Sequence, residues 1–366
     1  MSRRERFLVA VKGGIPDRIP IFDFLDSQDL FKKIIGRRPE VYNAEDAVYC
    51  SAKLGLDAAF IPFEGFMGYS AKKRKNENVY TDEWGTTYRK TKFSWPEDSP
   101  VDFPIKSKKD LLTYKVPDLC KSERLKGIKL AVKLNKNFDL AIMGGVVGPL
   151  TVAFVLAGWE RMSYWLYDDI QTVKSLFKIG CLFFKEAIRY LIMEGADCIC
   201  IADDLAYKSG LFFSPNLLRR YLFPYLEEMI SVAKKGDVPV FFHSDGNIAE
   251  ILCDLVDMGI DCLNPLQRTA GMSLKKIKEK YGEKISLSGN VDSSITLPFG
   301  TPEEVRKQTL ECIREAGLGG GYILSSDCDL RDIMPYENIM AMIETGKKYG
   351  KYPLTTNDKG NSTIKI

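Results

Sequence analysis

The residues best suited to chemistry are His243 and Asp245, which lie at the end of an apolar run. Residues 238–242 have the composition of a buried strand, and His243 is the only histidine among 366 residues. Gly246 and Asn247 follow, and a helical pattern then begins. A buried strand that ends in such side chains is typical of the active-site edge of an α/β protein. A lone histidine is more often a hydrogen-bonded core residue, however, so the rest of the chain must decide between these interpretations.

Polar side chains also follow most of the other predicted strands. They are Asp23 and Asp26 after the first strand, Asp203 and Asp204 after the fourth, Asn264 and Gln267 after the sixth, Asn290 and Asp292 after the seventh, and Asp327 and Cys328 after the eighth. A single acid at a strand end is usually a helix cap or a turn residue. A ring of carboxylates that includes one histidine and one cysteine is harder to explain as turn chemistry.

His243, Asp245 and Cys328 would together supply nitrogen, oxygen and sulfur ligands. Such a set suits zinc, which binds these ligand types in a tetrahedral shell and, in catalytic sites, keeps one position open. The bound ion polarises the group in the open position or lowers its pKa. The spacing alone is weak evidence, because Cys328 is equally readable as a structural thiol and Asp245 as a helix N-cap.

Eight strand candidates, most of them separated by helical patterns, would position these residues. They cover residues 18–24, 56–63, 139–143, 196–202, 238–243, 261–264, 284–288 and 321–325. The alternation predicts a single (β/α)8 barrel, the TIM-barrel class of α/β fold, over residues 1–354 with an N-terminal extension. No G-x-G-x-x-G opens a helix after a strand, so a doubly wound dinucleotide-binding sheet lacks support.

Two segments fall outside the barrel pattern. Residues 65–107 contain Trp84, Trp95, several prolines and many charges, and we expect a loop or small hairpin inserted over the barrel mouth. An insertion of this length is long enough to cover a substrate. Residues 355–366 are polar and are expected to form a flexible C-terminal tail.

The composition excludes several functional classes. The net charge is +3 with no long block of like charge, so no nucleic-acid footprint is expected. No run reaches 18 apolar residues, which argues against a membrane-spanning helix. The nine cysteines are scattered without a C-x-x-C pair, and residues 1–8 lack the apolar core of a signal peptide. We therefore expect reduced thiols and a cytoplasmic location.

Several motifs, in the right order, resemble those of the uroporphyrinogen decarboxylase superfamily. They are Arg4-Glu-Arg-Phe-Leu, Pro16-Asp-Arg-Ile-Pro, Gly148-Pro, Gly158-Trp-Glu, Ala202-Asp-Asp-Leu-Ala-Tyr-Lys, Phe213-Ser-Pro, Phe242-His-Ser-Asp-Gly-Asn, Gly259-Ile-Asp-Cys-Leu-Asn-Pro, Gly289-Asn-Val-Asp and Pro335-Tyr-Glu-Asn. The resemblance covers the chain nearly end to end, and it implies the same (β/α)8 fold.

The decarboxylases of this superfamily carry an arginine cluster just after the first strand, where it binds the propionates of the porphyrinogen. The corresponding residues 22–28 of this chain contain two aspartates and no arginine. Carboxylates cannot replace guanidinium groups in binding a polyanion. Porphyrinogen decarboxylation is therefore not expected.

The other branch that the chain resembles consists of cobalamin-dependent methyltransferases. They hold zinc with a His-x-Cys pair after one strand and a cysteine near the last. The matching positions here are His243, Asp245 and Cys328, so aspartate replaces the first cysteine. A carboxylate is a harder ligand than a thiolate and leaves a less electron-rich zinc. This departure makes the chain more similar to demethylases of methoxylated aromatics than to enzymes that activate the thiol of coenzyme M.

The resemblance thus predicts a zinc-dependent methyltransferase that moves a methyl group from a small donor, with a methoxylated aromatic favoured, to the cob(I)alamin of a separate corrinoid protein. We expect catalytic roles for Asp203, Asp204 and Asn290, and donor binding by Asp23, Tyr207, Trp84 and Gln267. The alternatives are a methylcobalamin:thiol methyltransferase of the coenzyme M type, a decarboxylase of the same fold and a non-catalytic corrinoid-binding module. A homodimer is also left open.

Overall fold

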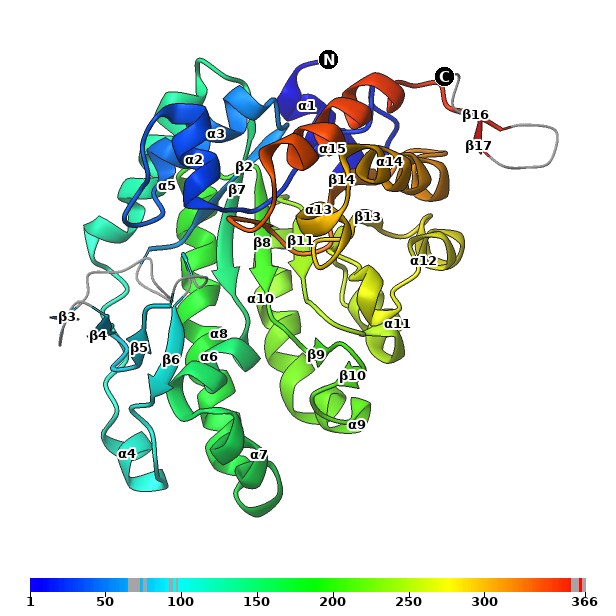
Figure 1. The fold of residues 1–366 in the computed structure, drawn as a ribbon. Helices are drawn as coiled ribbons and strands as arrows, with labels where there is room; N and C mark the ends of the chain where they lie inside the picture. The colour runs from blue at the N-terminus through cyan, green and yellow to red at the C-terminus, as the bar shows by residue number, and fades with distance from the viewer. Residues whose placement is uncertain (65–72, 75–77, 92–94, 97, 357–361, 364–366) are drawn as a thin grey trace.

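A parallel sheet of seven strands forms the centre of the computed structural model, which describes residues 1–64, 73–74, 78–91, 95–96, 98–356 and 362–363 (Figure 1). In sheet order the strands are β14 (Tyr322–Ser326), β13 (Ser286–Val291), β12 (Cys262–Asn264), β11 (Val240–His243), β8 (Cys198–Ala202), β7 (Ala141–Val147) and β2 (Ala58–Pro62). Their sequences are nearly continuous apolar runs, as expected for parallel strands that are covered on both faces.

Residues 20–22 occupy the eighth position, between the two edges of this sheet. Ile21 forms a parallel bridge with Leu324 of β14, and its carbonyl accepts the backbone N–H of Asp57 beside β2. Pro20 lacks an N–H and cannot donate to a β-ladder, which explains why the bonding here is too sparse for a regular strand. The predicted first strand thus lies where expected, and the (β/α)8 fold is confirmed.

Helices surround the sheet, in keeping with the alternating pattern of the sequence. The longer ones are α2 (Gln28–Ile35), α3 (Ala44–Leu54), α5 (Lys126–Asn135), α6 (Pro149–Ala157), α7 (Trp159–Asp168), α8 (Ile170–Met193), α10 (Phe223–Lys235), α12 (Leu274–Tyr281), α14 (Pro302–Ala316) and α15 (Tyr336–Tyr349). A capping box between Thr301 and Glu304 starts α14. Among the described residues, no helix is both long enough and apolar enough to cross a membrane.

The N-terminal helix α1 (Arg3–Val11) covers the end of the barrel at which the strands begin (Figure 1). Phe7 of α1 is fully buried and packs edge-to-face against Phe22 on the barrel axis. Phe22 in turn contacts Phe241 of β11 with ring centroids 5.5 Å apart. This end of the barrel is therefore filled by apolar rings.

The described part of the early insertion is a four-stranded antiparallel sheet instead of a single hairpin. Its strands are β3 (Lys73–Arg74), β4 (Val79–Thr81), β5 (Thr87–Arg89) and β6 (Ser99–Asp102). Trp84 anchors it, since its buried ring packs against Phe183 and Phe184 of α8. Residues 65–72, 75–77, 92–94 and 97 lie outside the described residues, so the extent of one barrel over residues 1–354 and a cover over its mouth stay predictions. Most of the expected tail, 357–361 and 364–366, also lies outside them.

One local prediction was wrong. The third strand was expected to end at residue 143, but β7 runs on through Gly144 and Gly145 to Val147. A Cβ on Gly145 would lie 2.3 Å from the ring of Phe60 on the neighbouring β2. Glycine here makes room for an aromatic ring and does not mark a turn.

Candidate active site at the strand ends

A cavity of about 150 Å³ lies at the C-terminal ends of the strands. Its wall consists of Phe24, Asp26, Phe60, Ala202, Asp204, His243, Asp245, Cys328, Asp329 and Arg331. The cavity contains all three predicted metal ligands. An apolar cavity of comparable volume in another protein holds one benzene ring, so the size suits a small donor.

His243 and Asp245 reach the cavity because β11 ends there. His243 is the last residue of β11 and lies in register with Ala202 of β8 and Asn264 of β12. The chain then turns at Gly246, whose φ is +82° and whose missing Cβ would lie 2.6 Å from the backbone of Ala206. Only glycine fits this turn, which returns the Asp245 side chain towards the imidazole.

The side chains of Asp204, His243 and Asp245 form a compact group of ligand atoms. One atom from each lies within 4.8 Å of the others. Cys328 joins them through Asp245, since its Sγ donates to Oδ2 of that carboxylate at 3.3 Å. The backbone N–H of Asp245 donates to Asp204 Oδ1 at 2.9 Å, which fixes the two acids relative to each other. The compact group is therefore Asp204, His243 and Asp245, and the predicted ligand Cys328 contacts it through Asp245.

One atom of this group has no hydrogen-bond partner. Oδ1 of Asp245 is buried and is left unsatisfied among the described residues. Nε2 of His243 lies 3.9 Å away, which is too far for a hydrogen bond. Zinc–nitrogen and zinc–oxygen bonds are each about 2.0–2.2 Å long, so two atoms at this separation can bind one ion. A buried, unpaired carboxylate oxygen normally costs stability, and the donor set fits a metal that would satisfy it.

The electrostatics of the site agree with this fit. Burial raises the pKa of Asp245, the imidazole of His243 opposes the rise, and the carboxylate of Asp204 adds to it. Burial together with Asp329 and Asp245 holds the pKa of the Cys328 thiol well above its usual value. Burial lowers the pKa of His243, but the carboxylates of Asp245 and Asp204 outweigh this and raise it overall. The raised pKa values mean that Asp245, Cys328 and His243 tend to keep their protons in the metal-free protein. A divalent cation that binds these side chains would displace the protons.

Asp203 and Asp204 are adjacent in sequence but have different surroundings. Asp204 is exposed and lines the cavity. Asp203 is fully buried and accepts the backbone N–H groups of Leu150 and Thr151 in the first turn of α6. A Cβ on Gly148 would collide with this carboxylate at 2.2 Å. Asp203 therefore supports α6 and does not line the cavity.

The other predicted polar residues also lie behind the cavity wall. Asn290 is buried, and its Nδ2 donates to the carbonyls of Leu266 and Met272. Asp23 is buried and accepts the N–H and hydroxyl of Ser326. Their catalytic and donor-binding roles remain predictions.

Gln267 and Tyr207 surround the turn at Gly246. Oε1 of Gln267 accepts the backbone N–H of Gly246, and the carbonyl of Tyr207 accepts the N–H of Asn247. Half of the Tyr207 side chain is exposed, and its ring stacks on Phe212. The donor-binding roles of both residues are likewise untested.

The aromatic wall of the cavity comes from residues that sequence reasoning missed. Phe24 and Phe60 meet edge-to-face with centroids 4.9 Å apart, and Phe24 also contacts the His243 ring at 5.2 Å. Trp84, by contrast, is buried against α8 and is absent from the wall. The sequence does contain a signal for Phe24. Side chains two residues apart in an extended segment share a face, so Phe24 should point inward like Phe22.

Asp329 and Arg331 were also missed. The guanidinium of Arg331 forms two bonds to Asp329, at 2.6 and 2.8 Å. Arg331 is the only lysine or arginine among the described residues of the cavity wall, and its charge is already matched by that carboxylate. The cavity is therefore acidic overall.

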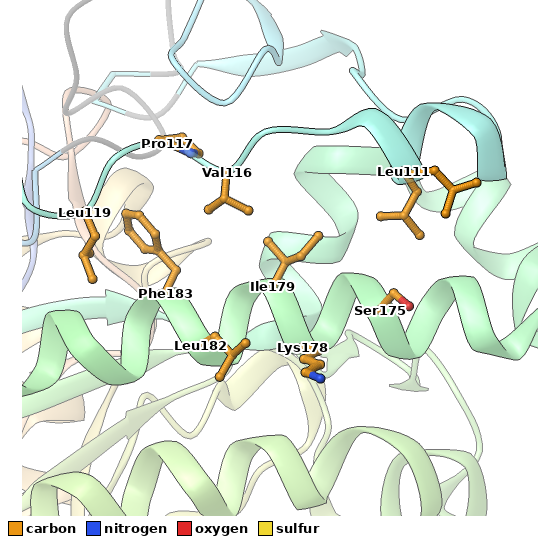
Figure 2. Close-up of a pocket in the computed structure, with 10 residues that line it drawn as sticks. Leu111, Val116, Pro117, Leu119, Ser175, Lys178, Ile179, Leu182 and Phe183 are labelled. Atoms are coloured by element: carbon orange, nitrogen blue, oxygen red, sulfur yellow. The ribbon is translucent and has the colours of Figure 1, made fainter.

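A larger groove of about 610 Å³ lies on the outside of the barrel, between residues 111–119 and helix α8 (Figure 2). Its wall is almost entirely aliphatic and aromatic, with Ser175 and Lys178 as the polar members. The Ser175 hydroxyl donates to the carbonyl of Gln171 within its own helix. No pair of the described residues that line it could transfer a proton or bind a metal, so the smaller cavity is the candidate active site.

Comparison with known families agrees with the motifs. Residues 91–349, more than half of the chain, match the family model described as uroporphyrinogen decarboxylase (URO-D). A uroporphyrinogen decarboxylase of Chlorobium luteolum is 27% identical over 232 residues, covering 58% of this chain and 61% of the relative.

Methyltransferases align over more of the chain. Methylcobamide:CoM methyltransferase MtaA of Methanosarcina barkeri is 26% identical over 361 residues, covering 94% of this chain and 98% of the relative. Methylated-thiol–coenzyme M methyltransferase of Methanosarcina mazei is 27% identical over 263 residues, covering 70% and 68%. The solved structure of a methyltransferase from Methanosarcina mazei superimposes with a TM-score of 0.73 at 24% identity, over 95% of this chain and 99% of that one.

Proposed function

The chain belongs to the uroporphyrinogen decarboxylase family, and on that basis we propose that it is a zinc-dependent, corrinoid-linked methyltransferase. It would move a methyl group from a small donor, with a methoxylated aromatic favoured, to the cob(I)alamin of a separate corrinoid protein. Methyltransferase relatives that align over nearly the whole chain support the reaction class. The observation that carries the proposal is the buried, unpaired Oδ1 of Asp245 beside His243 and Cys328.

In this function His243, Asp245 and Cys328 would hold the zinc. When bound, zinc supplies a Lewis acid that polarises the ether oxygen of the donor. Asp204 holds Asp245 in place through its backbone N–H. Phe24 and Phe60 would bind the aromatic ring of the donor and exclude water from the reacting carbon. The methyl–oxygen bond breaks, the phenolate keeps its electron pair, and cobalt(I) of the partner corrinoid supplies the pair for the new bond to carbon.

The dimensions and charge of the cavity argue against a porphyrinogen decarboxylase. A volume of about 150 Å³ is far too small for a tetrapyrrole, since pockets for drug-sized ligands begin at about 300 Å³. The four carboxylates on the wall would repel a polyanion, and Arg331 already pairs with Asp329.

Methylation of a thiol such as coenzyme M is the second candidate, because two of the relatives carry coenzyme M in their names. Asp245 distinguishes the two reactions. A thiol acceptor must coordinate the metal, release its proton to solvent and attack as a thiolate, which an electron-rich, sulfur-ligated zinc favours. An ether donor needs only polarisation of its oxygen, for which a harder ligand set is better suited.

Metal analysis of the purified protein is the first test. We expect one zinc per chain in the wild type, and less than a tenth of that in His243→Ala and Cys328→Ser. Cys253→Ser is the matched control, because Cys253 is an exposed thiol outside the cavity wall. Absence of zinc from the wild type after growth and purification with zinc would refute the proposal.

Turnover decides between the two reactions. The protein is mixed with cob(I)alamin and 2-methoxyphenol, or with methylcobalamin and coenzyme M, and the cobalt oxidation state is followed by absorbance. Methyl transfer from 2-methoxyphenol that His243→Ala abolishes would support the favoured donor class. Transfer only to coenzyme M would favour the second candidate.

A further inference from the structure

A chain of buried hydrogen bonds runs from His243 across three neighbouring strands. Nδ1 of His243 lies 2.7 Å from Oδ1 of Asn264 on β12. Nδ2 of Asn264 donates to the hydroxyl of Ser288 on β13 at 3.1 Å, and this hydroxyl lies 3.1 Å from that of Ser325 on β14. Ser325 donates to the main-chain carbonyl of Ser326 at 2.9 Å. Asn264, Ser288 and Ser325 are at most 1% exposed, so water does not compete for these bonds.

The carbonyl at the far end gives this chain a direction. A carbonyl only accepts, so the single proton of the Ser325 hydroxyl points to Ser326. The proton shared between the two serines must then come from Ser288, which leaves the Ser288 oxygen to accept from Asn264. The amide of Asn264 therefore turns its NH2 group to the serines and its oxygen to His243. An amide oxygen also only accepts, so Nδ1 of His243 carries the proton.

We propose that Asn264 is the positioning residue of the active site: directed by Ser288 and Ser325, it holds His243 as the Nδ1–H tautomer and aims the lone pair of Nε2 into the cavity. This lone pair faces the unpaired Oδ1 of Asp245 at 3.9 Å. Two lone pairs that face each other repel, whereas a cation placed between them is attracted to both. The edge-to-face contact of Phe24 on the imidazole, at 5.2 Å, restricts rotation of the ring further.

The purpose of this arrangement rests on the proposed function, in which the Nε2 lone pair binds a metal. In free imidazole the proton is found on either nitrogen. In a histidine that binds a metal, the nitrogen that faces the metal must carry no proton. A hydrogen bond to the other nitrogen fixes the tautomer and the ring orientation, and its loss typically weakens metal affinity about 10–100-fold. The tautomer itself exists without any metal, so it can be measured separately.

The single histidine of the chain makes the measurement simple. Protein labelled with ¹⁵N-histidine and carrying no histidine tag gives signals from one imidazole, and metal is removed with a chelator. The pH is raised until the ring titrates no further, so that the neutral form is observed. We expect the wild type to show a protonated Nδ1 and an unprotonated Nε2. An Nε2–H tautomer, or an average of the two forms, would overturn the proposal.

Variants test which residue sets the tautomer. Asn264→Leu removes the acceptor, and we expect the proton to move to Nε2 and zinc affinity, measured by competition with a chromophoric chelator, to fall about 10–100-fold. Asn264→Asp keeps an acceptor, so the Nδ1–H form should be retained even if Asn264→Leu folds poorly. Ser286→Ala is the matched control. Ser286 is a buried residue of β13, the strand that carries Ser288, but its hydroxyl donates to the carbonyls of Ala10 and Val11 at the end of the barrel where the strands begin.

The outcomes separate this inference from the proposed function. A tautomer that is unchanged in Asn264→Leu, or equally disturbed in Ser286→Ala, refutes the positioning role. The expected tautomers in a protein that binds no zinc would support the positioning role and count against the proposed metal chemistry.

Discussion

The two ends of the barrel differ in whether their charged side chains have partners of opposite charge. At the end where the strands begin, Asp57 is fully buried between two arginines, with bonds of 2.8 Å to Arg6 and 2.9 Å to Arg18. Arg6 also forms two bonds to Asp17, and this guanidinium lowers the pKa of Asp17 to about 2. Each of these charged groups has a partner of opposite sign within hydrogen-bond distance.

At the end where the strands finish, carboxylates outnumber cations. Burial raises the pKa of Asp203 to about 7 and that of Asp23 to about 8, and among the described residues no arginine or lysine bonds to either. Asp245 keeps a buried oxygen without any partner among the described residues. We call the end where the strands begin the closed end and the end where they finish the open end. The closed end uses its charges to hold the N-terminal segment onto the barrel, whereas the open end leaves polar groups unsatisfied that a ligand can satisfy.

The largest effect is expected from Asp57→Ala at the closed end. It leaves Arg6 and Arg18 without their shared buried partner, and breaking a buried ion pair by removing one member costs about 3–5 kcal/mol. Guanidinium chloride unfolding measures the loss, while zinc content per folded chain should stay unchanged. Glu279→Ala is the control, since Glu279 forms only an exposed pair with Lys275 and should cost less than about 0.5 kcal/mol. A loss below about 1 kcal/mol in Asp57→Ala would contradict the structural role of this end.

The pH dependence of stability should distinguish the two ends in the metal-free protein. Asp203 and Asp23 have folded pKa values above the unfolded value of 3.8, so their contribution is fully present below that value and is lost as pH rises towards about 7 and 8. Each group can lower the unfolding free energy by at most about 1.4 kcal/mol per pH unit in this window. Asp17 has the opposite sign, because its contribution is lost as pH falls from 3.8 towards about 2.

Unfolding in guanidinium chloride at several pH values, with chelator present, measures these slopes. Asp23→Asn should make the decline between pH 5 and 8 shallower, because asparagine cannot ionise. Arg6→Lys, which weakens the two-bond contact with Asp17, should change the slope of stability against pH only below about pH 4, whatever it does to the stability that Asp57 provides at every pH. A decline above pH 5 that is identical in Asp23→Asn and wild type would show that the open end carries no such strain.

Asp203 and Asp204 show where sequence reasoning stops. The apolar runs predicted the strands, and the strand ends predicted the cavity that His243, Asp245 and Cys328 share. Which of two adjacent acids faces that cavity depends on the path of the chain after the strand, where regular alternation ends. Asp203 turns to the N–H groups of α6, and only the folded position of α6 reveals it.

The aromatic wall was hidden for a related reason. Trp84 was predicted to bind the donor because it lies in the insertion that was expected to cover the barrel mouth, but packing against α8 buries it. Phe60 reaches the cavity because Gly145 on the neighbouring strand has no side chain, and such a contact between strands cannot be read from either segment alone. Asn264 was visible as a strand-end residue, but its bonds to Ser288 depend on the register of β12 and β13.

Asp245→Asn should separate stability from function at the open end. It removes a buried, partly unsatisfied carboxylate, so the metal-free protein at pH 8 should become more stable by on the order of 1 kcal/mol. Zinc content should fall, because a neutral amide is a much weaker ligand than a carboxylate. Unfolding with chelator and metal analysis measure the two effects. Lower stability of the metal-free variant would mean that the Asp245 carboxylate supports the fold, as the closed-end acids do.

The smallest effect compares two phenylalanines on the barrel axis. Phe241 lies in the closed half, fully buried against Phe22, whereas Phe60 contacts Phe24 on the cavity wall. An aromatic contact contributes about 0.5–1.5 kcal/mol, so Phe60→Leu should raise KM for 2-methoxyphenol about two- to tenfold with little change in kcat. Phe241→Leu should lower stability by about 1 kcal/mol and leave KM unchanged. If both variants change KM equally, the aromatic rings act as one packed column, and the division between a closed structural end and an open binding end does not extend to the interior of the barrel.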